Sequence, residues 1–99
     1  MRLTVKEKTS IIQTILSYDQ DAKIYLFGSR TNDALKGGDI GLLVESQTIN
    51  YEQKIEIIAK IKNDIEDQKI DIMLSSDILN DDDEFIQKIR PTLSYLTDR

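Results

Sequence analysis

Three short apolar runs constrain the fold of this chain more than any other feature of its sequence. They occupy residues 23–27, 39–44 and 69–74, and each has the length and residue types of a single β-strand. A short connection, 28–38, joins the first two runs and predicts an antiparallel pair. A long connection, 45–68, precedes the third run and leaves room for the helix that a parallel crossover requires.

Helical patterns surround these runs. Residues 5–18 carry apolar side chains at helical spacing, and residues 51–67 do so most clearly. A last helix is expected to begin near Asp83 and to end at Pro91, which lacks an amide proton. The predicted fold is therefore α+β, an α/β sandwich in which helices flank a small mixed β-sheet. The apolar face of the second helix is expected to hold Ile55, Ile58, Ile61 and Ile65.

Composition excludes several kinds of site. The chain has 99 residues, which predicts one domain over residues 1–99. It has no histidine and no cysteine, so this chain cannot supply a zinc–histidine site, a histidine-based triad or a disulfide. The net charge of −5 argues against direct binding of nucleic acid and suits a basic protein partner. No apolar stretch approaches the ~20 residues of a membrane span, and no signal peptide is evident, so a cytoplasmic location is expected.

The turn after the first run carries the first candidate site. Gly28 has no side chain, so a phosphate can approach its backbone closely. The amide and hydroxyl of Ser29 could bind phosphate oxygens, and Arg30 could neutralise their charge. The alternative is an ordinary turn in which Ser29 caps a short helix and Arg30 is a solvated surface cation.

Two acids in the other runs complete the candidate constellation. Asp39 opens the second run, and Asp71 lies at the centre of the third. Carboxylates on neighbouring strands could bind Mg²⁺, which prefers oxygen ligands. The alternatives are turn chemistry for Asp39 and an exposed sheet face for Asp71. Position 41 shares a strand face with Asp39, but it is Gly41 and offers no ligand.

Together these elements resemble the minimal nucleotidyltransferase (MNT) domain family, a small branch of the polymerase-β-like superfamily. The family pattern is a strand, Gly-Ser, about nine residues, Asp-x-Asp on the next strand and a third acid on a later strand. The resemblance implies Gly28, Ser29 and Arg30 as nucleotide-binding residues, with Asp39 and Asp71 as catalytic metal ligands. It further implies two Mg²⁺ ions and ATP as the AMP donor.

The resemblance also implies a partner. Many stand-alone members resemble antitoxins that act on a HEPN-type ribonuclease toxin, and some are thought to transfer AMP to a toxin hydroxyl. A hetero-oligomer with such a toxin is therefore expected, without membrane or nucleic-acid binding. A small-molecule acceptor is a weaker alternative, because a chain of 99 residues has no second domain to hold it.

Gly41 is the departure from the family pattern. Loss of the acid that bridges the two ions is expected to slow two-metal transfer by two to four orders of magnitude, about 3–5 kcal/mol in the barrier. Two hypotheses follow: an Mg²⁺-dependent adenylyltransferase impaired by Gly41, and a disabled antitoxin or binding module that neutralises a partner by contact. Phe27 and Phe85 are expected in the core, and the apolar residues Tyr95 and Leu96 belong either to the core or to such a contact.

Overall fold

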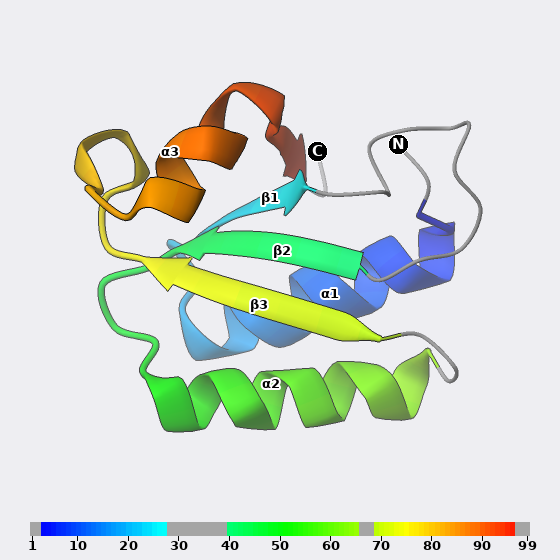
Figure 1. The fold of residues 1–99 in the computed structure, drawn as a ribbon. Helices are drawn as coiled ribbons and strands as arrows, with labels where there is room; N and C mark the ends of the chain where they lie inside the picture. The colour runs from blue at the N-terminus through cyan, green and yellow to red at the C-terminus, as the bar shows by residue number, and fades with distance from the viewer. Residues whose placement is uncertain (1–2, 28–39, 66–68, 97–99) are drawn as a thin grey trace.

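The computed structural model describes residues 3–27, 40–65 and 69–96. Within them the chain forms a four-stranded mixed β-sheet with helices on both faces (Figure 1). In chain order the elements are α1 (Val5–Tyr18), β1 (Lys23–Phe27), β2 (Ile40–Glu45), α2 (Tyr51–Asp64), β3 (Ile70–Ser75), η2 (Ile78–Asn80), α3 (Glu84–Ile89), η3 (Arg90–Thr92) and β4 (Ser94–Leu96). The α+β architecture predicted from the sequence is confirmed.

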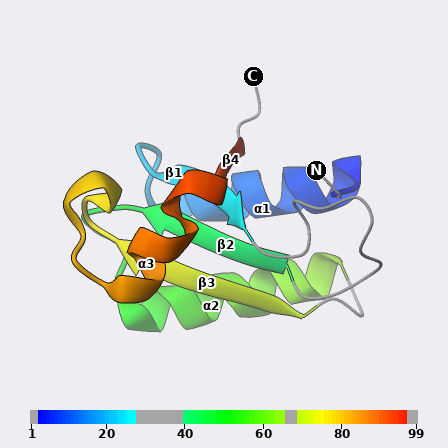
Figure 2. The same ribbon diagram turned by 45° about the horizontal axis from the view of Figure 1, so that its top comes forward.

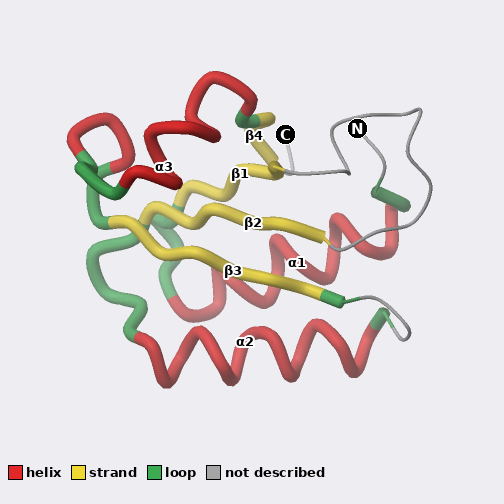
Figure 3. The backbone as a smooth tube through the Cα atoms, in the orientation of Figure 1, coloured by secondary structure: helices red, strands yellow, loops and turns green. Residues whose placement is uncertain are grey.

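The sheet has the order β3-β2-β1-β4. Strands β1 and β2 are antiparallel, whereas β2 and β3 are parallel, as the two connection lengths predict. The C-terminal end of β1 and the N-terminal ends of β2 and β3 therefore lie at one edge of the sheet (Figure 3). This edge is where the candidate chemistry is expected.

Helices α1 and α2 cover one face of the sheet and enclose the larger core. Both begin with a capping box. The side chains of Thr4 and Asn50 accept the backbone N–H groups of the third helical residues, and the side chains of those residues accept the backbone N–H groups of Thr4 and Asn50. The buried side chains of this core come from all four strands and both helices. They include Ile11, Ile15, Ile24, Leu26, Ile40, Leu42, Ile57, Ile61, Ile72 and Leu96.

The opposite face of the sheet is covered by η2, α3 and η3 (Figure 2). Its smaller core joins Phe27 and Leu43 of the sheet to Ile78 and Ile86. Asp83 caps α3 by accepting the N–H groups of Phe85 and Ile86, so the acidic run 81–84 is a helix start as expected. Helix α3 ends at Ile89, and the turn that follows it contains Pro91.

The structure also differs from the sequence-based expectations in three places. The C-terminal residues form a fourth strand, β4, paired with β1; Leu96 belongs to the core, and Tyr95 is 54% exposed. Phe85, expected in the core, is 45% exposed, and Ile55, expected on the apolar face of α2, is 51% exposed. The predicted residues Ile61 and Ile65 are buried and Ile58 packs against the core, while Ile57, which was not predicted, is buried with them.

Candidate functional site

Three residues form one row across the edge of the sheet where the candidate acids were predicted. Phe27 at the end of β1 is paired with Gly41 of β2, and Gly41 is paired with Asp71 of β3. Side chains at paired positions lie on the same face of a sheet. Asp71 therefore projects from the face on which a ligand at position 41 would project, and its side chain is exposed. The structure thus places positions 41 and 71 side by side, whereas the predicted juxtaposition of Asp71 with Asp39 lies outside the described residues.

The other predicted site residues lie outside the described part of the chain. These are Gly28, Ser29 and Arg30, which follow β1 in sequence, and Asp39, which precedes β2. Their roles in binding a nucleotide and a metal ion stay predictions from the sequence. Among the residues that the structure does describe, no group of three or more acidic side chains is placed to share a metal ion.

Gly41 is closely covered by Phe27. A Cβ atom built at position 41 would lie 2.9 Å from Cε2 of the Phe27 ring, 3.1 Å from its Cδ2 and 2.9 Å from the Phe27 carbonyl oxygen. Side-chain carbons do not approach other heavy atoms this closely without a shift. One of these contacts is with backbone, so a rotation of the ring alone would not relieve the overlap. Any side chain at position 41 requires β1 and β2 to move apart locally.

The Phe27 ring is itself held in place by its neighbours. Only 8% of its surface is exposed, and it packs with Leu43, Ile78 and Ile86. The ring of Phe85 meets it edge to face, with 5.7 Å between ring centroids and an interplanar angle of 75°. Such aromatic pairs add stability beyond the area that they bury. The ring therefore occupies the space beside Gly41 as part of a packed core.

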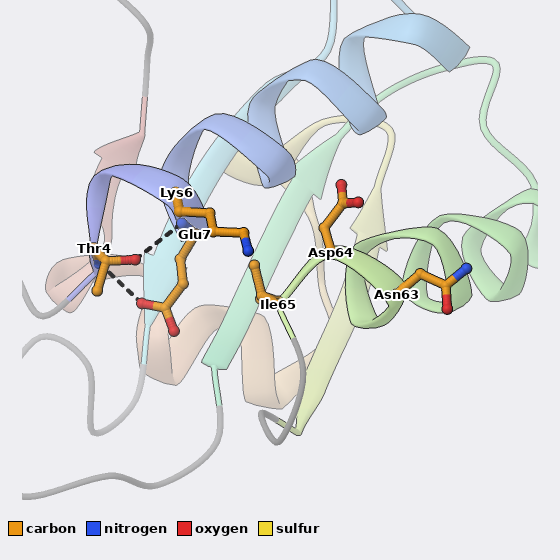
Figure 4. A pocket seen from close by; sticks show the side chains of 6 residues that line it. All are labelled: Thr4, Lys6, Glu7, Asn63, Asp64 and Ile65. Atoms are coloured by element: carbon orange, nitrogen blue, oxygen red, sulfur yellow. Dashed lines mark hydrogen bonds between the residues drawn. The ribbon is translucent and has the colours of Figure 1, made fainter.

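The described hollows lie away from this row. One, of about 520 Å³, lies between the N-terminus of α1 and the C-terminus of α2 (Figure 4). Thr4 and Glu7 line it and exchange the two capping-box hydrogen bonds, drawn as dashed lines. It therefore lies on the face of the sheet that α1 and α2 cover, opposite to the face of Asp71. Two of its lining residues, Thr4 and Glu7, serve to cap α1.

A second hollow, of about 550 Å³, lies at the opposite end of the sheet and is lined by Tyr25, Leu79, Arg90 and Leu93 among others. Burial raises the pKa of the Tyr25 phenol, and the nearby Glu45 carboxylate raises it further. The Nη2 atom of Arg90 donates to the carbonyl oxygens of Ile78 and Asp81, so this side chain fastens η2 to η3. These two hydrogen bonds give Arg90 a structural role, and its buried Nε atom has no hydrogen-bond partner among the described residues.

Comparison with known proteins identifies the class of protein. Residues 8–94 match the family model described as "Nucleotidyltransferase domain". The chain therefore belongs to the nucleotidyltransferase domain family, which is of the polymerase-β-like type. A comparison with curated proteins found no match. The described residues contain no helix long and apolar enough to cross a membrane.

Members of this family typically use Mg²⁺ and a nucleoside triphosphate, so the residues present can be tested against a two-ion site. Asp71 has a suitable oxygen donor, is exposed and is paired with position 41. Position 41 has no donor, and the space for one is filled by the Phe27 ring. Among the described residues this row therefore supplies one carboxylate, which by itself does not fit the two metal ions that clamp a phosphate.

Phe27 is the site residue that sequence reasoning missed. The sequence shows the residue directly before Gly28, but it does not show which residue of β2 is paired with it. The contact could have been inferred only by combining three facts. Phe27 ends one strand, Gly41 lies near the start of the next, and a glycine in a strand often marks a close approach of another group. The observed register turns that general rule into a specific contact.

Proposed function

We propose that this chain is a nucleotidyltransferase-family domain that acts by binding a protein partner, as a disabled antitoxin, and not by two-metal transfer of AMP. The observation that carries the proposal is the packing of Phe27 against Gly41. An active site of the family type needs a carboxylate at position 41. Here that position has neither the ligand nor the room for it.

The identity of the partner rests on the family resemblance and on charge. Stand-alone domains that resemble this one accompany HEPN-type ribonuclease toxins, so we propose such a ribonuclease as the partner. RNA-binding surfaces are rich in basic residues because they contact phosphates. A chain with a net charge of −5 can cover such a surface by electrostatic complementarity. Neutralisation by contact needs no nucleotide.

The test is an RNA-cleavage assay with a purified HEPN-type ribonuclease and increasing amounts of this chain. The proposal predicts stoichiometric inhibition without ATP or Mg²⁺, retained in the Asp39→Asn/Asp71→Asn double variant. Those substitutions remove both candidate ligands while keeping side chains of the same size. Inhibition that requires Mg²⁺ and ATP, and leaves an AMP adduct on the ribonuclease, would overturn the proposal.

A second candidate function is residual transfer of AMP to a partner hydroxyl. The placement of Asp71 favours it, because this acid is exposed on the face and at the edge of the sheet where a third catalytic acid is expected. Such a carboxylate can act as a base for an acceptor hydroxyl. This candidate predicts an AMP adduct that disappears in Asp71→Asn, which the same assay detects by mass spectrometry of the ribonuclease.

A further inference from the structure

The outer side of α2 is an apolar surface that the fold leaves without a partner. Two other sides of this helix are used. Towards α1, Glu56 accepts a hydrogen bond from the Tyr18 hydroxyl at 3.0 Å, and Asp64 accepts one from the Ser10 hydroxyl at 2.8 Å. Towards the sheet, Ile57 and Ile61 are buried in the larger core.

The remaining side carries Tyr51, Ile55 and Ala59, which recur every four residues and therefore form one row along the helix. Tyr51 is 67% exposed and Ile55 is 51% exposed, and Ala59 is also exposed. In Figure 1, α2 runs along the lower border of the molecule with no described element beneath it. The Nζ atom of Lys54, on the same helix, lies 5.2 Å from the centre of the Tyr51 ring, but no other described element covers the row, which we name the α2 row.

Two charged residues lie beside the α2 row, an acid near one end of the helix and a base near the other. Glu52 lies in the first turn of α2 and Lys62 in the last turn. Both are exposed, and neither makes an ion pair or hydrogen bond with the described part of the chain. One helix on its own also favours this polarity, because of its dipole. In addition, the two charges flank an exposed apolar row and lie at equal distances along the helix from position 57.

We propose that the α2 row is a self-association surface, on which α2 of a second copy of this chain packs antiparallel about a twofold axis. In such an isologous contact, residue i meets residue j and residue j meets residue i. A twofold axis at the level of position 57 sets Ile55 against Ala59 of the second copy. The same axis brings Glu52 within reach of Lys62 of the second copy. Both ends of the helix then gain an ion pair.

The side chains of the row suit a helix–helix contact. Ala59 is small, so it lets the two backbones approach at the point where Ile55 packs. Tyr51 supplies an aromatic anchor of the kind enriched at interfaces. Because the helix has 14 residues, the shared length is about 21 Å. This length gives an interface smaller than the standard size, so a weak dimer that forms at high protein concentration is expected.

Charge also argues for a second copy over a basic partner at this surface. The row has an acid at one end and a base at the other, so a uniformly basic surface would meet Lys62 with repulsion. An antiparallel copy of the same helix meets Glu52 with Lys62 and Lys62 with Glu52. The inference does not depend on the proposed function, because it uses no residue of the candidate site.

The experiment is sedimentation velocity of the full chain over a concentration range up to about 1 mM, for the native sequence and four variants. Ile55→Glu places a charge in the row and is expected to weaken dimerisation at least tenfold. Val5→Glu is the matched control, because Val5 is an aliphatic residue that is 82% exposed on α1. It is expected to leave the dissociation constant unchanged.

The charge exchange tests the antiparallel register. Glu52→Lys sets like charges together at both ends of the twofold contact and is expected to weaken dimerisation about tenfold. Adding Lys62→Glu to that variant reverses both charges and is expected to restore the native dissociation constant. Circular dichroism spectra that match the native chain confirm that each variant is folded.

Three results would overturn the proposal. The first is a monomer at every concentration of the native chain. The second is a dimer that Ile55→Glu leaves intact, which would place the contact elsewhere on the molecule. The third is a failure of the Glu52→Lys/Lys62→Glu variant to recover the association lost in Glu52→Lys. Dimerisation in the native chain with loss and recovery in this order supports it.

Discussion

Replacing Gly41 with alanine adds one methyl group beside the ring of Phe27 and beside its carbonyl oxygen. The added Cβ would lie 2.9 Å from each of two atoms and 3.1 Å from a third. A substitution that overfills a packed site costs about 2 kcal/mol of unfolding free energy, within the usual range of 1–3. Alanine is favoured over glycine inside a strand by about 0.5–1 kcal/mol. The two effects leave a net destabilisation of about 1–1.5 kcal/mol.

A double-mutant cycle identifies the ring as one source of this loss. Phe27→Leu removes the Cε2 contact but leaves the carbonyl contact, so it is expected to relieve part of the overlap. The double variant should then be about 0.5–1 kcal/mol more stable than the sum of the single changes predicts. Tyr25→Leu is the matched control, because Tyr25 is paired with Leu43 and not with Gly41. With that control the changes should add to within about 0.5 kcal/mol.

Urea unfolding followed by circular dichroism measures all six proteins of this cycle and its control. A shift in the midpoint at constant slope shows a change of stability without a change of the unfolding reaction. The reasoning fails if Gly41→Ala is as stable as the native chain. It also fails if Phe27→Leu and Gly41→Ala combine additively, because the ring would then not occupy the space beside position 41.

Three further changes test the rest of the fold. Leu96→Ala should cost about 2–4 kcal/mol in urea unfolding because Leu96 is 1% exposed in the core, and a loss below 1 would contradict the assignment of β4. Asp83→Ala should cost about 1 kcal/mol through loss of the α3 cap, whereas the exposed neighbour Asp82→Ala should change stability by less than about 0.5; equal effects would refute the cap. The hydrogen bond from the Ser46 hydroxyl, at 2.5 Å, holds the pKa of Asp19 below its ordinary value. This contribution is present above the unfolded-state pKa and is lost as pH falls through the lower folded-state pKa, so Asp19→Asn should destabilise the protein more at pH 7 than at pH 3. A difference that stays constant with pH would refute it.

Strand and helix positions followed from the sequence because each core face has a clear period. The first strand, Lys23–Phe27, and the first helix, Val5–Tyr18, have the predicted bounds. The connection lengths also fixed which strand pairs are antiparallel and which parallel. These features depend on local spacing and on chain reach, which the sequence contains directly.

Other features needed the tertiary arrangement. Strand β4 has only three residues and no period of its own, so its pairing with β1 could not be foreseen. The exposure of Ile55 depends on which sides of α2 face the sheet and α1. Besides the apolar core, the contacts with α1 include hydrogen bonds to Glu56 and Asp64, which the apolar period of the helix does not show.

The candidate site divides in the same way. Alternation along β3 predicted the face from which Asp71 projects, but its pairing with Gly41 became visible only in the register of β2 and β3. It also showed that Gly41 lacks a ligand. The filling of that space by Phe27 depends on the register between β1 and β2, which no local pattern contains.

The central claim is that Gly41 and Phe27 prevent a two-ion site, so the most direct measurement is calorimetric titration of ATP into the native chain with and without Mg²⁺. The account predicts that Mg²⁺ does not tighten ATP binding. When Gly41→Asp is titrated for comparison, Gly41→Ala is the control, because it adds the Cβ atom at position 41 without the carboxylate. Binding of ATP by the native chain that is tightened by Mg²⁺, and weakened by Asp39→Asn, would contradict the account.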